Sequence, residues 1–378
     1  MYDILLPLEP VSRVIKIYLL ILILKIKNVV IEIFYVLYKF MKENSIIISF
    51  YNSYPITSGS SAVTTAFFNA WPGRKKLFLM NHETEIKKKN INNFKIKSNN
   101  SFIKFIYLIP YLLFIYSEIK KKKVKYIIFE GASWTGFVYI SYLFFLILGI
   151  KAKFIYHAHN VDYFFRRKNI FISSLSFYFE KKILQNFFLS TSVSEADFRT
   201  FNSLFKIKTK ILPNGIEVIK RKLKKKMNDK YIIFSGSLEY NQNKKIFDKL
   251  IKNEFKILQK YIPEIKIYHS GGGKFKFYKN DKNIIEFGTL SFNNYLNLLK
   301  NSLCVIIPGS NVTGTKIKII EALCYDKTVF AHKKSLQGIQ SKFNKYFVYK
   351  DLKEFENKIQ NFKKNKYTNN RLKLIGKY

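Results

Sequence analysis

The stretch PGSNVTGTKIKIIEALC, residues 308–324, contains the pattern around which the rest of the chain is organised. Four apolar residues, CVII at 304–307, run into it and are typical of a buried strand. Small and polar residues follow through Thr315, and apolar residues then recur three or four places apart from Ile317 onward. This order predicts a strand, a loop and a helix in succession.

The predicted helix carries a lysine and a glutamate on one side. At about 100° per residue, Lys318 and Glu321 lie about 60° apart, whereas most other side chains of the helix are aliphatic. Buried charges need a partner or a polar ligand, and the free N–H groups of a helix N-terminus attract phosphate. Two interpretations remain open: an anion-binding site, or an internal ion pair beside an ordinary solvated Lys316.

Length and composition favour a folded chain with two domains. The 378 residues suffice for two cores of ordinary size, and 48% hydrophobic with 17% aromatic residues exclude disordered and collagen-like classes. Basic residues outnumber acidic ones 66 to 25, and the net charge of +41 normally indicates an anionic partner. Because lysine makes up most of the excess and accompanies much Ile, Asn, Phe and Tyr, part of it reflects biased nucleotide composition. Attraction to anionic lipid headgroups is still expected.

The cysteines and two apolar segments indicate in which cellular compartment the protein is expected and whether it crosses a membrane. Cys304 and Cys324 read as buried free thiols, and without a cysteine framework or a cleavable signal we expect a cytoplasmic protein. Residues 1–44 are apolar but interrupted by charges, which favours an amphipathic helical extension lying on the protein or on a bilayer surface. The uncharged run 131–150 lies between two strand-like segments, so it predicts the crossover helix of a βαβ unit rather than a membrane span.

Strands and helices alternate through two consecutive series. The first occupies residues 45–216, a basic linker follows at 217–230, and the pattern restarts over 231–378. Within the first series, residues 82–101 read as a loop region, followed by one helix with Pro110 inside it. The alternation predicts an α/β fold with two Rossmann-like doubly wound parallel-sheet domains. Ligands bind such folds at the carboxyl ends of the strands, here in a cleft between the domains.

Two histidines close one strand of the first domain. His157 and His159 follow an apolar segment, and alternation places both on the same side. Such histidines could bond sugar hydroxyls or act as acid or base, and the alternative is a structural loop with hydrogen-bonded histidines. Metal binding finds weaker support, because no third ligand at a sensible spacing is visible.

Small-residue turns follow several strands. The loop that contains Gly59 and Ser60 could line a phosphate or a sugar through backbone N–H groups, although it is not a GxGxxG motif and lacks a Walker lysine. Gly236, Ser237 and the triple glycine 271–273 form tight turns suited to close approach by a nucleotide. No serine-hydrolase elbow, paired glycosidase carboxylates or groove-reading nucleic-acid element is visible in the sequence.

Seven motifs follow one another in a fixed order: FIYHAHNVDYFFRR (154–167), FEKKILQN (179–186), STSVSEADFRTF (190–201), ILPNGIEV (211–218), FSGSLEYNQN (234–243), YHSGGG (268–273) and GTKIKIIEAL (314–323). Their order and spacing together resemble the group 1 glycosyltransferases of the retaining, two-domain GT-B type. The resemblance covers roughly residues 125–340, whereas residues 1–44 have no counterpart.

The resemblance implies a nucleotide-sugar donor held mainly by the second domain and a glycan or glycolipid acceptor held mainly by the first. Glu321 would bind the donor ribose, Lys316 and Lys318 would face the diphosphate or fix that acid, and His159 would contact the donor sugar near the reacting carbon. The implied donor-binding residues are Gly236, Ser237, Lys244, Gly271, Gly272, Gly314, Thr315, Lys316, Lys318 and Glu321, with catalytic roles for His159 and Glu321. The implied acceptor-binding residues are Gly59, Ser60, Asn160 and Arg166.

The chain departs from the family pattern at three places. A second acid, often found eight residues before the position of Glu321, is replaced by Thr313. The arginine common after the glycine of the GS turn is Ser237, and the following lysine has only an approximate match in Lys244 or Lys245. These departures resemble a sub-group whose motif reads GTxxKxxEA.

We therefore predict a retaining glycosyltransferase that transfers a sugar from a nucleotide-sugar to a growing surface polysaccharide or lipid-linked glycan. Lysines and a helix N-terminus would stabilise the leaving diphosphate, so neither a metal nor another cofactor is expected. The expected partners include an anionic membrane surface on the cytoplasmic side and no nucleic acid. Two alternatives stay open: an inverting epimerase or transferase on the same architecture, and a non-catalytic basic scaffold that binds anionic lipid or nucleic acid.

Overall fold

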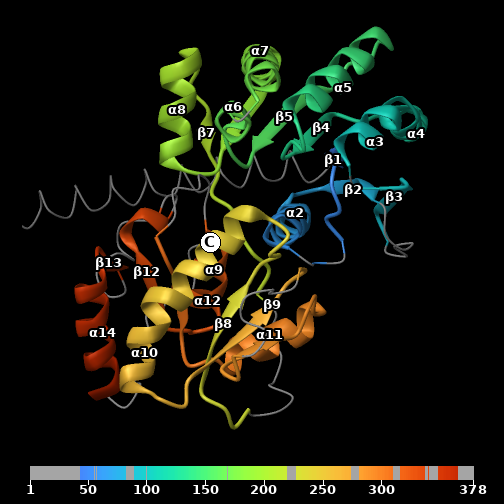
Figure 1. Ribbon diagram of the computed structural model, residues 1–378. Coiled ribbons are helices and arrows are strands. Elements are labelled where there is room, and N and C mark those ends of the chain that lie inside the picture. Colours follow the sequence, from blue (N-terminus) through green and yellow to red (C-terminus); the bar gives the residue numbers. More distant parts are fainter. Residues whose placement is uncertain are drawn as a thin grey trace, which may run out of the picture.

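The computed structural model of the chain describes residues 43–54, 56, 58–81, 89–98, 100–167, 169–218, 227–273, 281–309, 316–336, 339 and 348–364. The helical extension expected for residues 1–44 therefore lies almost entirely outside the described residues, as do part of the expected linker, Gly314 and Thr315. The described chain forms two α/β domains with parallel sheets (Figure 1), so the predicted fold class is confirmed.

The first sheet has seven parallel strands in the order β3-β2-β1-β4-β5-β6-β7. Strands β4 and β5 pair with Glu130 opposite His157, so the register brings these two residues side by side at the carboxyl end of the sheet. The strands are β1 (Asn44–Ser49), β2 (Arg74–Asn81), β3 (Ile91–Lys95), β4 (Tyr126–Glu130), β5 (Lys153–Ala158), β6 (Leu189–Ser192) and β7 (Lys210–Ile211).

Helices cover both faces of this sheet. Residues along β1 show the division, because Ile46 and Ile48 pack into a core with α4, α5 and α7, whereas Ile47 packs on the opposite face with Phe68 of α2. Burial on both faces explains why the central strands read as continuous apolar runs. The helices are α2 (Gly59–Ala70), α3 (Ser101–Ile106), α4 (Leu108–Lys121), α5 (Thr135–Ile147), α6 (Asp162–Phe165), α7 (Ile170–Asn186) and α8 (Glu195–Phe205).

Two predictions for the first domain were wrong. Residues 82–101 include the edge strand β3, whose polar sequence INNFK does not suggest its pairing with β2. The single helix expected around Pro110 is divided at Tyr107 into α3 and α4. This division places Pro110 in the first turn of α4, where its missing N–H breaks no helical hydrogen bond.

The apolar run 131–150 forms the crossover helix α5 between the parallel strands β4 and β5, as predicted. Phe137 and Phe145 of this helix are buried in the first-domain core. Within the described part of the chain, no helix is long and apolar enough to cross a membrane.

The second domain contains two three-stranded parallel sheets, ordered β10-β9-β8 and β11-β12-β13. A parallel bridge between Ile232 and Cys304 joins them, and the Leu303 N–H donates a hydrogen bond of 2.8 Å to the Tyr231 carbonyl. The strands are β8 (Tyr231–Ser235), β9 (Lys266–Ser270), β10 (Ile284–Glu286), β11 (Val305–Ile307), β12 (Val329–His332) and β13 (Val348–Tyr349). The helices are α9 (Asn241–Leu250), the π-helical turn η1 (Ile251–Phe255), α10 (Lys256–Tyr261), α11 (Phe292–Asn301), α12 (Ile317–Cys324), the 3₁₀ turn η2 (Lys333–Ser335) and α14 (Leu352–Lys364).

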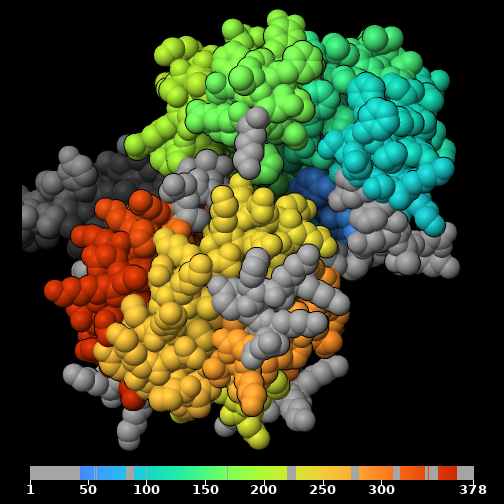
Figure 2. All heavy atoms as spheres, viewed as in Figure 1, coloured from blue at the N-terminus to red at the C-terminus, as the bar shows by residue number. Residues whose placement is uncertain are grey.

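The two domains meet along α2. Its Asn69 side chain donates a hydrogen bond of 2.8 Å to Glu217, which follows the first sheet, and its N-terminal Gly59 lies against Ile317 of α12. Figure 2 shows the first domain, blue to green, in contact with the second, yellow to red. The N-terminus of α2 therefore faces the start of α12 across the domain boundary.

Candidate functional site

Helix α12 begins at Ile317, as the sequence pattern predicts. Ile319 and Ala322 anchor it in the second-domain core. The helix brings Lys318 to the carboxyl ends of β8 and β11, which is where a doubly wound sheet binds its ligands.

Glu321 is buried and is held by a tyrosine that the sequence pattern does not single out. The Tyr295 hydroxyl of α11 donates a hydrogen bond of 2.6 Å to Glu321 Oε2 and lies 3.4 Å from Ser235 Oγ at the end of β8. Burial raises the pKa of the Glu321 carboxyl, while the hydrogen bond from Tyr295 and the charge of Lys318 oppose this shift. Tyr295 therefore orients the carboxylate and favours its ionised form.

Among the described residues, Lys318 forms no ion pair with Glu321, so the structure does not bear out the ion-pair interpretation. The Lys318 ammonium lies 5.1 Å from the centroid of the Phe234 ring, and burial lowers its pKa to about 8 despite the opposing effect of Glu321. Lys316 at the start of the helix is also buried enough that its pKa falls to about 8. Two half-buried lysines in one place favour an anionic ligand, which would stabilise their charged forms.

Two glycine turns pack against each other beside these lysines. The Gly236 N–H donates to the Ser270 carbonyl at 2.8 Å, and the Leu238 N–H donates to the Gly272 carbonyl at 2.7 Å. Gly236 has a φ of +151°, and a Cβ there would lie 2.8 Å from Lys318 Nζ. Glycine at this position therefore lets the lysine approach the backbone of the turn.

Glycine is also needed at Gly271 and Gly272 because the two turns pack closely on each other. A Cβ at Gly271 would lie 2.4 Å from the Gly236 carbonyl oxygen, and one at Gly272 would lie 3.3 Å from Ser237 Oγ. Asn243 of α9 adds a hydrogen bond of 2.8 Å from its side chain to the Ser237 carbonyl. Close packing of one turn on the other thus accounts for these glycines as well as close approach by a nucleotide does.

A cavity of about 310 Å³ lies at the carboxyl ends of β8 and β11. The second domain supplies Tyr295, Lys316 and Lys318 to its wall, and the first domain supplies Gly59 and Ser60. Two of the predicted donor residues and two of the predicted acceptor residues therefore border one cavity, whereas Glu321 and His159 are not part of its described wall. Most of the remaining wall is aliphatic.

Lys244 does not line this cavity, although it is among the predicted donor-binding residues. It lies in the first turn of α9, and its neighbours Gln242 and Asn243 form part of the wall instead. Near this approximate motif match, the cavity is therefore lined by the amide side chains of Gln242 and Asn243 and not by the Lys244 ammonium.

The serine-rich loop before α2 forms a helix cap. Ser58 Oγ accepts a hydrogen bond of 3.1 Å from the Ser61 N–H, and the Ser58 N–H donates one of 2.8 Å to Ser61 Oγ. This reciprocal capping box starts the helix at Gly59 and directs its positive end toward the cavity.

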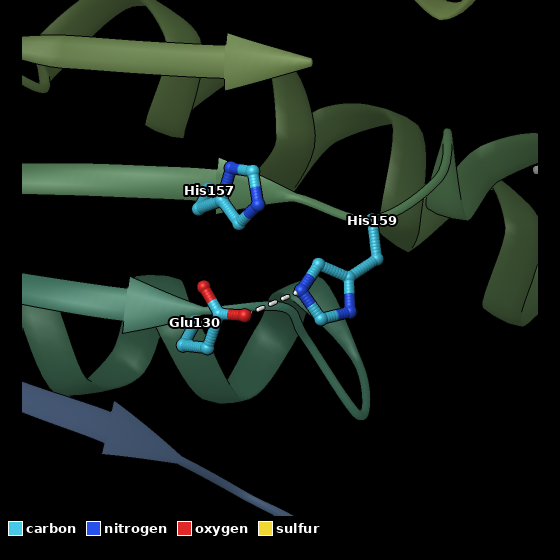
Figure 3. Close-up of side chains that lie close together, drawn as sticks. All are labelled: Glu130, His157 and His159. Atoms are coloured by element: carbon cyan, nitrogen blue, oxygen red, sulfur yellow. Dashed lines mark hydrogen bonds and ion pairs between the residues drawn. The ribbon is translucent and has the colours of Figure 1, made fainter. Parts of the chain in front are cut away.

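On the first-domain side, His159 pairs with Glu130 (Figure 3). His159 Nε2 lies 2.8 Å from Glu130 Oε1, and the Tyr51 hydroxyl lies 3.3 Å from His159 Nδ1 and 2.9 Å from Thr64 Oγ1. Burial and the charge of Glu130 raise the pKa of Tyr51, which therefore stays a neutral hydroxyl. The sequence offers only one signal for Glu130, an acid that ends an otherwise apolar strand.

His157 is buried beneath this pair. Its Nδ1 lies 2.6 Å from Thr191 Oγ1, and its ring stacks on Phe67 with the centroids 4.9 Å apart. The rings of His157 and His159 lie 5.3 Å apart, so they share one side as alternation predicts. Burial lowers the pKa of His157 to about 4, and the imidazole is therefore neutral at physiological pH.

Arg166 takes part in a structural network. Its Nε lies 3.0 Å from Asp162 Oδ1, and its Nη2 donates to the Ser133 carbonyl. Asp162 also accepts hydrogen bonds from the backbone and the hydroxyl of Thr135 at the start of α5. These contacts favour a structural role for Arg166 over the predicted contact with the acceptor. Asn160, the other predicted acceptor residue of this segment, is partly exposed next to His159.

No protein-family model matches the sequence. No curated protein matches it. The chain is similar in structure to WaaG, a glycosyltransferase involved in lipopolysaccharide biosynthesis, with a TM-score of 0.59 and 12% identity over 87% of this chain and 97% of that one. It is also similar to HepE from Anabaena in complex with UDP-glucose, with a TM-score of 0.56 and 13% identity over 85% and 90% of the two chains. A third similar structure is a glycosyltransferase from Rickettsia africae, with a TM-score of 0.54 and 16% identity over 86% and 89%.

These similarities extend over both domains. They show that the chain has the GT-B fold of glycosyltransferases, in agreement with the resemblance found in its motifs.

Proposed function

We propose that this protein is a glycosyltransferase that moves a sugar from a nucleotide-sugar donor to a glycan acceptor with retention of anomeric configuration. One observation carries the proposal: the cavity at the domain boundary is lined by two half-buried lysines with lowered pKa values and by the tyrosine that holds a buried carboxylate. This arrangement suits a ligand with a diphosphate and a hydroxylated sugar. The structurally similar HepE is seen with UDP-glucose, which supports the same class of donor for this chain.

The second domain would hold the donor. The Glu321 carboxylate, with one oxygen fixed by Tyr295, would accept hydrogen bonds from the ribose hydroxyls. Lys316 and Lys318 would pair with the diphosphate and stabilise its charge as it leaves. Because both lysines are half-buried, their attraction for phosphate is stronger than that of lysines fully exposed to water.

The first domain would position the reacting sugar. Glu130 and Tyr51 bond the two ring nitrogens of His159 and so fix the orientation of this ring. His159 would contact the donor sugar near the reacting carbon, and Gly59, Ser60 and Asn160 would border the acceptor. A front-face displacement requires a stabilised leaving group and a positioned acceptor rather than a protein nucleophile.

We place the acceptor on a membrane-bound glycan because of an exposed apolar stripe, defined here as Phe102, Ile106, Ile109 and Leu113 of α3 and α4. The spacing of four residues puts Phe102 and Ile106 on one side of α3, and the same spacing puts Ile109 and Leu113 on one side of α4. Four exposed lysines, residues 120–123, follow the stripe. Apolar side chains beside lysines suit the surface of a membrane that contains anionic lipids, so the proposed location is peripheral on the cytoplasmic side.

The first experiment is a thermal-shift screen of the purified protein against UDP, GDP, ADP and CMP, followed by turnover assays with sugars of the nucleotide that stabilises it. Glu321→Ala is expected to lower turnover by about 100-fold or more, because it removes one preorganised charged contact. Glu264→Ala is the matched control, since it removes an exposed carboxylate that pairs with Lys230 at the surface. Unchanged turnover in Glu321→Ala would exclude the proposed donor site.

Two further measurements separate the alternatives. An inverted anomeric configuration in the product, determined by NMR, would exclude the retaining mechanism. If the protein is instead a basic scaffold, no nucleotide will shift its melting temperature, and its binding to anionic lipid or nucleic acid will fall steeply with salt.

A further inference from the structure

A lysine without a charged partner is buried beside the loop that follows β4. Lys104 of the short helix α3 is only 3% exposed, and its ammonium donates a hydrogen bond of 3.3 Å to Ser133 Oγ. Within the described part of the chain it forms no ion pair, and burial lowers its pKa to about 8. Burying a lysine is costly unless an anion pairs with it. One neutral hydroxyl does not offset that cost.

Asp162, a carboxylate linked to the Ser133 loop, is already neutralised. It pairs with Arg166, whose Nη2 also donates to the Ser133 carbonyl. It further accepts hydrogen bonds from the N–H and the hydroxyl of Thr135. Asp162 is therefore not the counter-ion of Lys104, and the two cations Arg166 and Lys104 both contact Ser133.

The loop that carries Ser133 also borders His159. Gly131, two residues earlier, has a φ of +66°, and a Cβ there would lie 3.0 Å from His159 Nδ1. Two residues of chain span about 7 Å at most. Because His159 is proposed to contact the donor sugar near the reacting carbon, Ser133 lies on the first-domain side of the place where the acceptor would react.

We propose that Lys104 and Ser133 form an anion site, which binds a phosphate or carboxylate group carried by the acceptor glycan. The inference rests on the proposed function and names the class of acceptor, a glycan with an anionic group near the sugar that receives the transferred residue. The Lys104 ammonium would pair with the anion. The Ser133 hydroxyl accepts the bond from Lys104 and still has its own O–H to donate to the same group.

A ligand can reach the anion site without a movement of the backbone. Ser133 is half-buried, so its hydroxyl is accessible, whereas Lys104 is covered. The lysine side chain has a flexible four-carbon stem and three rotatable donors, and its ammonium can follow the ligand while α3 stays in place. The hydrogen bond from Arg166 to the Ser133 carbonyl holds the loop in position.

A lipid headgroup is another source of phosphate, because the exposed Phe102 and Ile106 lie on the same helix as Lys104. The burial of Lys104 favours a glycan instead. The headgroups of a bilayer would meet exposed lysines first, such as residues 120–123, whereas a single anionic group on a glycan can enter beside Ser133.

Saturation-transfer NMR with small sugars tests the anion site without a need for turnover. The full chain is first saturated with the nucleotide that the thermal-shift screen selects, so that Lys316 and Lys318 are occupied. It is then titrated with mannose 6-phosphate, glucuronate and mannose at constant ionic strength. We expect an anionic sugar to bind about tenfold or more tightly than mannose, because a hydrogen bond to a charged group accounts for that factor. The tighter of the two anionic sugars identifies the group as phosphate or carboxylate.

Lys104→Met should reduce the affinity for the anionic sugar to that for mannose. It should also raise the melting temperature of the unliganded protein at pH 7, because it replaces a buried charge that has no partner by an apolar side chain. Lys181→Met makes the same change of net charge at an exposed position on α7 and should match the wild type in both measurements. Ser133→Ala keeps the ammonium, should weaken binding by about threefold to tenfold, and serves if Lys104→Met does not fold.

Two results would overturn the proposal. One is equal binding of the anionic sugars in Lys104→Met and Lys181→Met. The other is a loss of binding to phosphatidylglycerol vesicles in Lys104→Met in place of the loss of sugar binding, which would assign Lys104 to a lipid headgroup. Failure of the proposed function looks different: no nucleotide shifts the melting temperature, yet the nucleotide-free protein still binds the anionic sugars through Lys104.

Discussion

At the scale of single residues, the donor site depends on a carboxylate that is buried yet ionisable. Burial raises the pKa of Glu321, and the hydrogen bond from Tyr295 is the larger of the two effects that oppose this shift. The tyrosine thus replaces part of the solvation that the carboxylate loses on folding. Lys318 opposes the shift through its charge but leaves its ammonium over Phe234, where a phosphate can pair with it.

Tyr295→Phe tests this role of the hydroxyl. We expect the free energy of unfolding to fall by about 1–3 kcal/mol, because a buried acceptor loses its donor, and the affinity for the nucleotide to fall by about tenfold. Chemical denaturation and calorimetric titration measure the two effects. Tyr240→Phe removes an exposed hydroxyl and should change neither quantity. A Tyr295→Phe variant with wild-type affinity would show that Tyr295 does not prepare Glu321 for the ligand.

The two half-buried lysines, Lys316 and Lys318, are expected to make nucleotide binding depend on pH. Their pKa values are about 8 in the free protein, and a bound diphosphate raises them because it favours the charged forms. Binding therefore takes up protons above pH 8, and affinity is full below about pH 8 and falls as the pH rises. The expected loss is up to about tenfold per lysine per pH unit.

Calorimetric titrations at pH 7 and pH 9 measure this dependence. Lys318→Met should weaken binding at pH 7 and roughly halve the pH slope, because one of the two titrating groups is gone. Lys260→Met, at an exposed surface position, should keep the wild-type slope. A wild-type affinity that does not change between pH 7 and pH 9 contradicts the assignment of these lysines to the diphosphate.

The residues found by sequence and those missed differ in one physical respect. Lys318 and Glu321 lie on one helix, so periodicity alone places them together, and His159 directly follows the strand β5 that carries His157. Tyr295 and Glu130 reach the same sites from other elements, through the packing of α11 on the second sheet and the pairing of β4 with β5. No local pattern encodes such neighbours, because they depend on strand order and helix packing.

At the scale of elements, the βα turns of the second domain combine two demands on glycine. Gly236 has a positive φ, and the missing Cβ also leaves the space that Lys318 Nζ enters. The turns at 236 and 271–273 close on each other through main-chain hydrogen bonds, so the position of one fixes the other.

The Gly236→Ala variant tests whether Gly236 is needed for its positive φ, for the space that Lys318 occupies, or for both. We expect a loss of stability of about 1–2 kcal/mol from the positive φ, together with weaker nucleotide binding because the new Cβ displaces Lys318. Gly149→Ala is the matched control, since Gly149 has a φ of +70° and no atom within 4 Å of the added Cβ. It should lose similar stability and keep wild-type affinity, as measured by denaturation and titration. Equal affinity in both variants would show that the contact with Lys318 has no part in binding.

The boundaries of helices and strands were predicted correctly where apolar spacing and turn residues give a clear local signal. The start of α12 at Ile317 and the crossover helix α5 were both predicted from apolar spacing and turn residues. Strand β3 was missed because an edge strand needs few apolar side chains, and the main-chain pairing with β2 requires no apolar pattern in its sequence. The break between α3 and α4 was missed because Pro110 is compatible with either a kink or a new helix start.

At the scale of the whole molecule, the first domain has two different outer surfaces. Its α2 side faces the second domain and the cavity, whereas α4, α5 and α7 cover the opposite face of the sheet. Large apolar side chains are exposed on these helices, including Leu113 on α4 and Ile147 on α5. A net charge of +41 adds a general attraction to anionic surfaces. The apolar stripe is the side of the protein that we expect to face the membrane.

Co-sedimentation with vesicles containing phosphatidylglycerol tests this preference. Leu113→Asp is expected to lower binding by about tenfold, because it removes an apolar side chain that would enter the interface and adds a charge repelled by anionic lipid. Leu352→Asp is the control, since it makes the same chemical change at an exposed position on α14 of the second domain and should bind as wild type. Equal loss in both variants would mean that net charge alone drives association, and no loss in either would assign it to residues outside the apolar stripe.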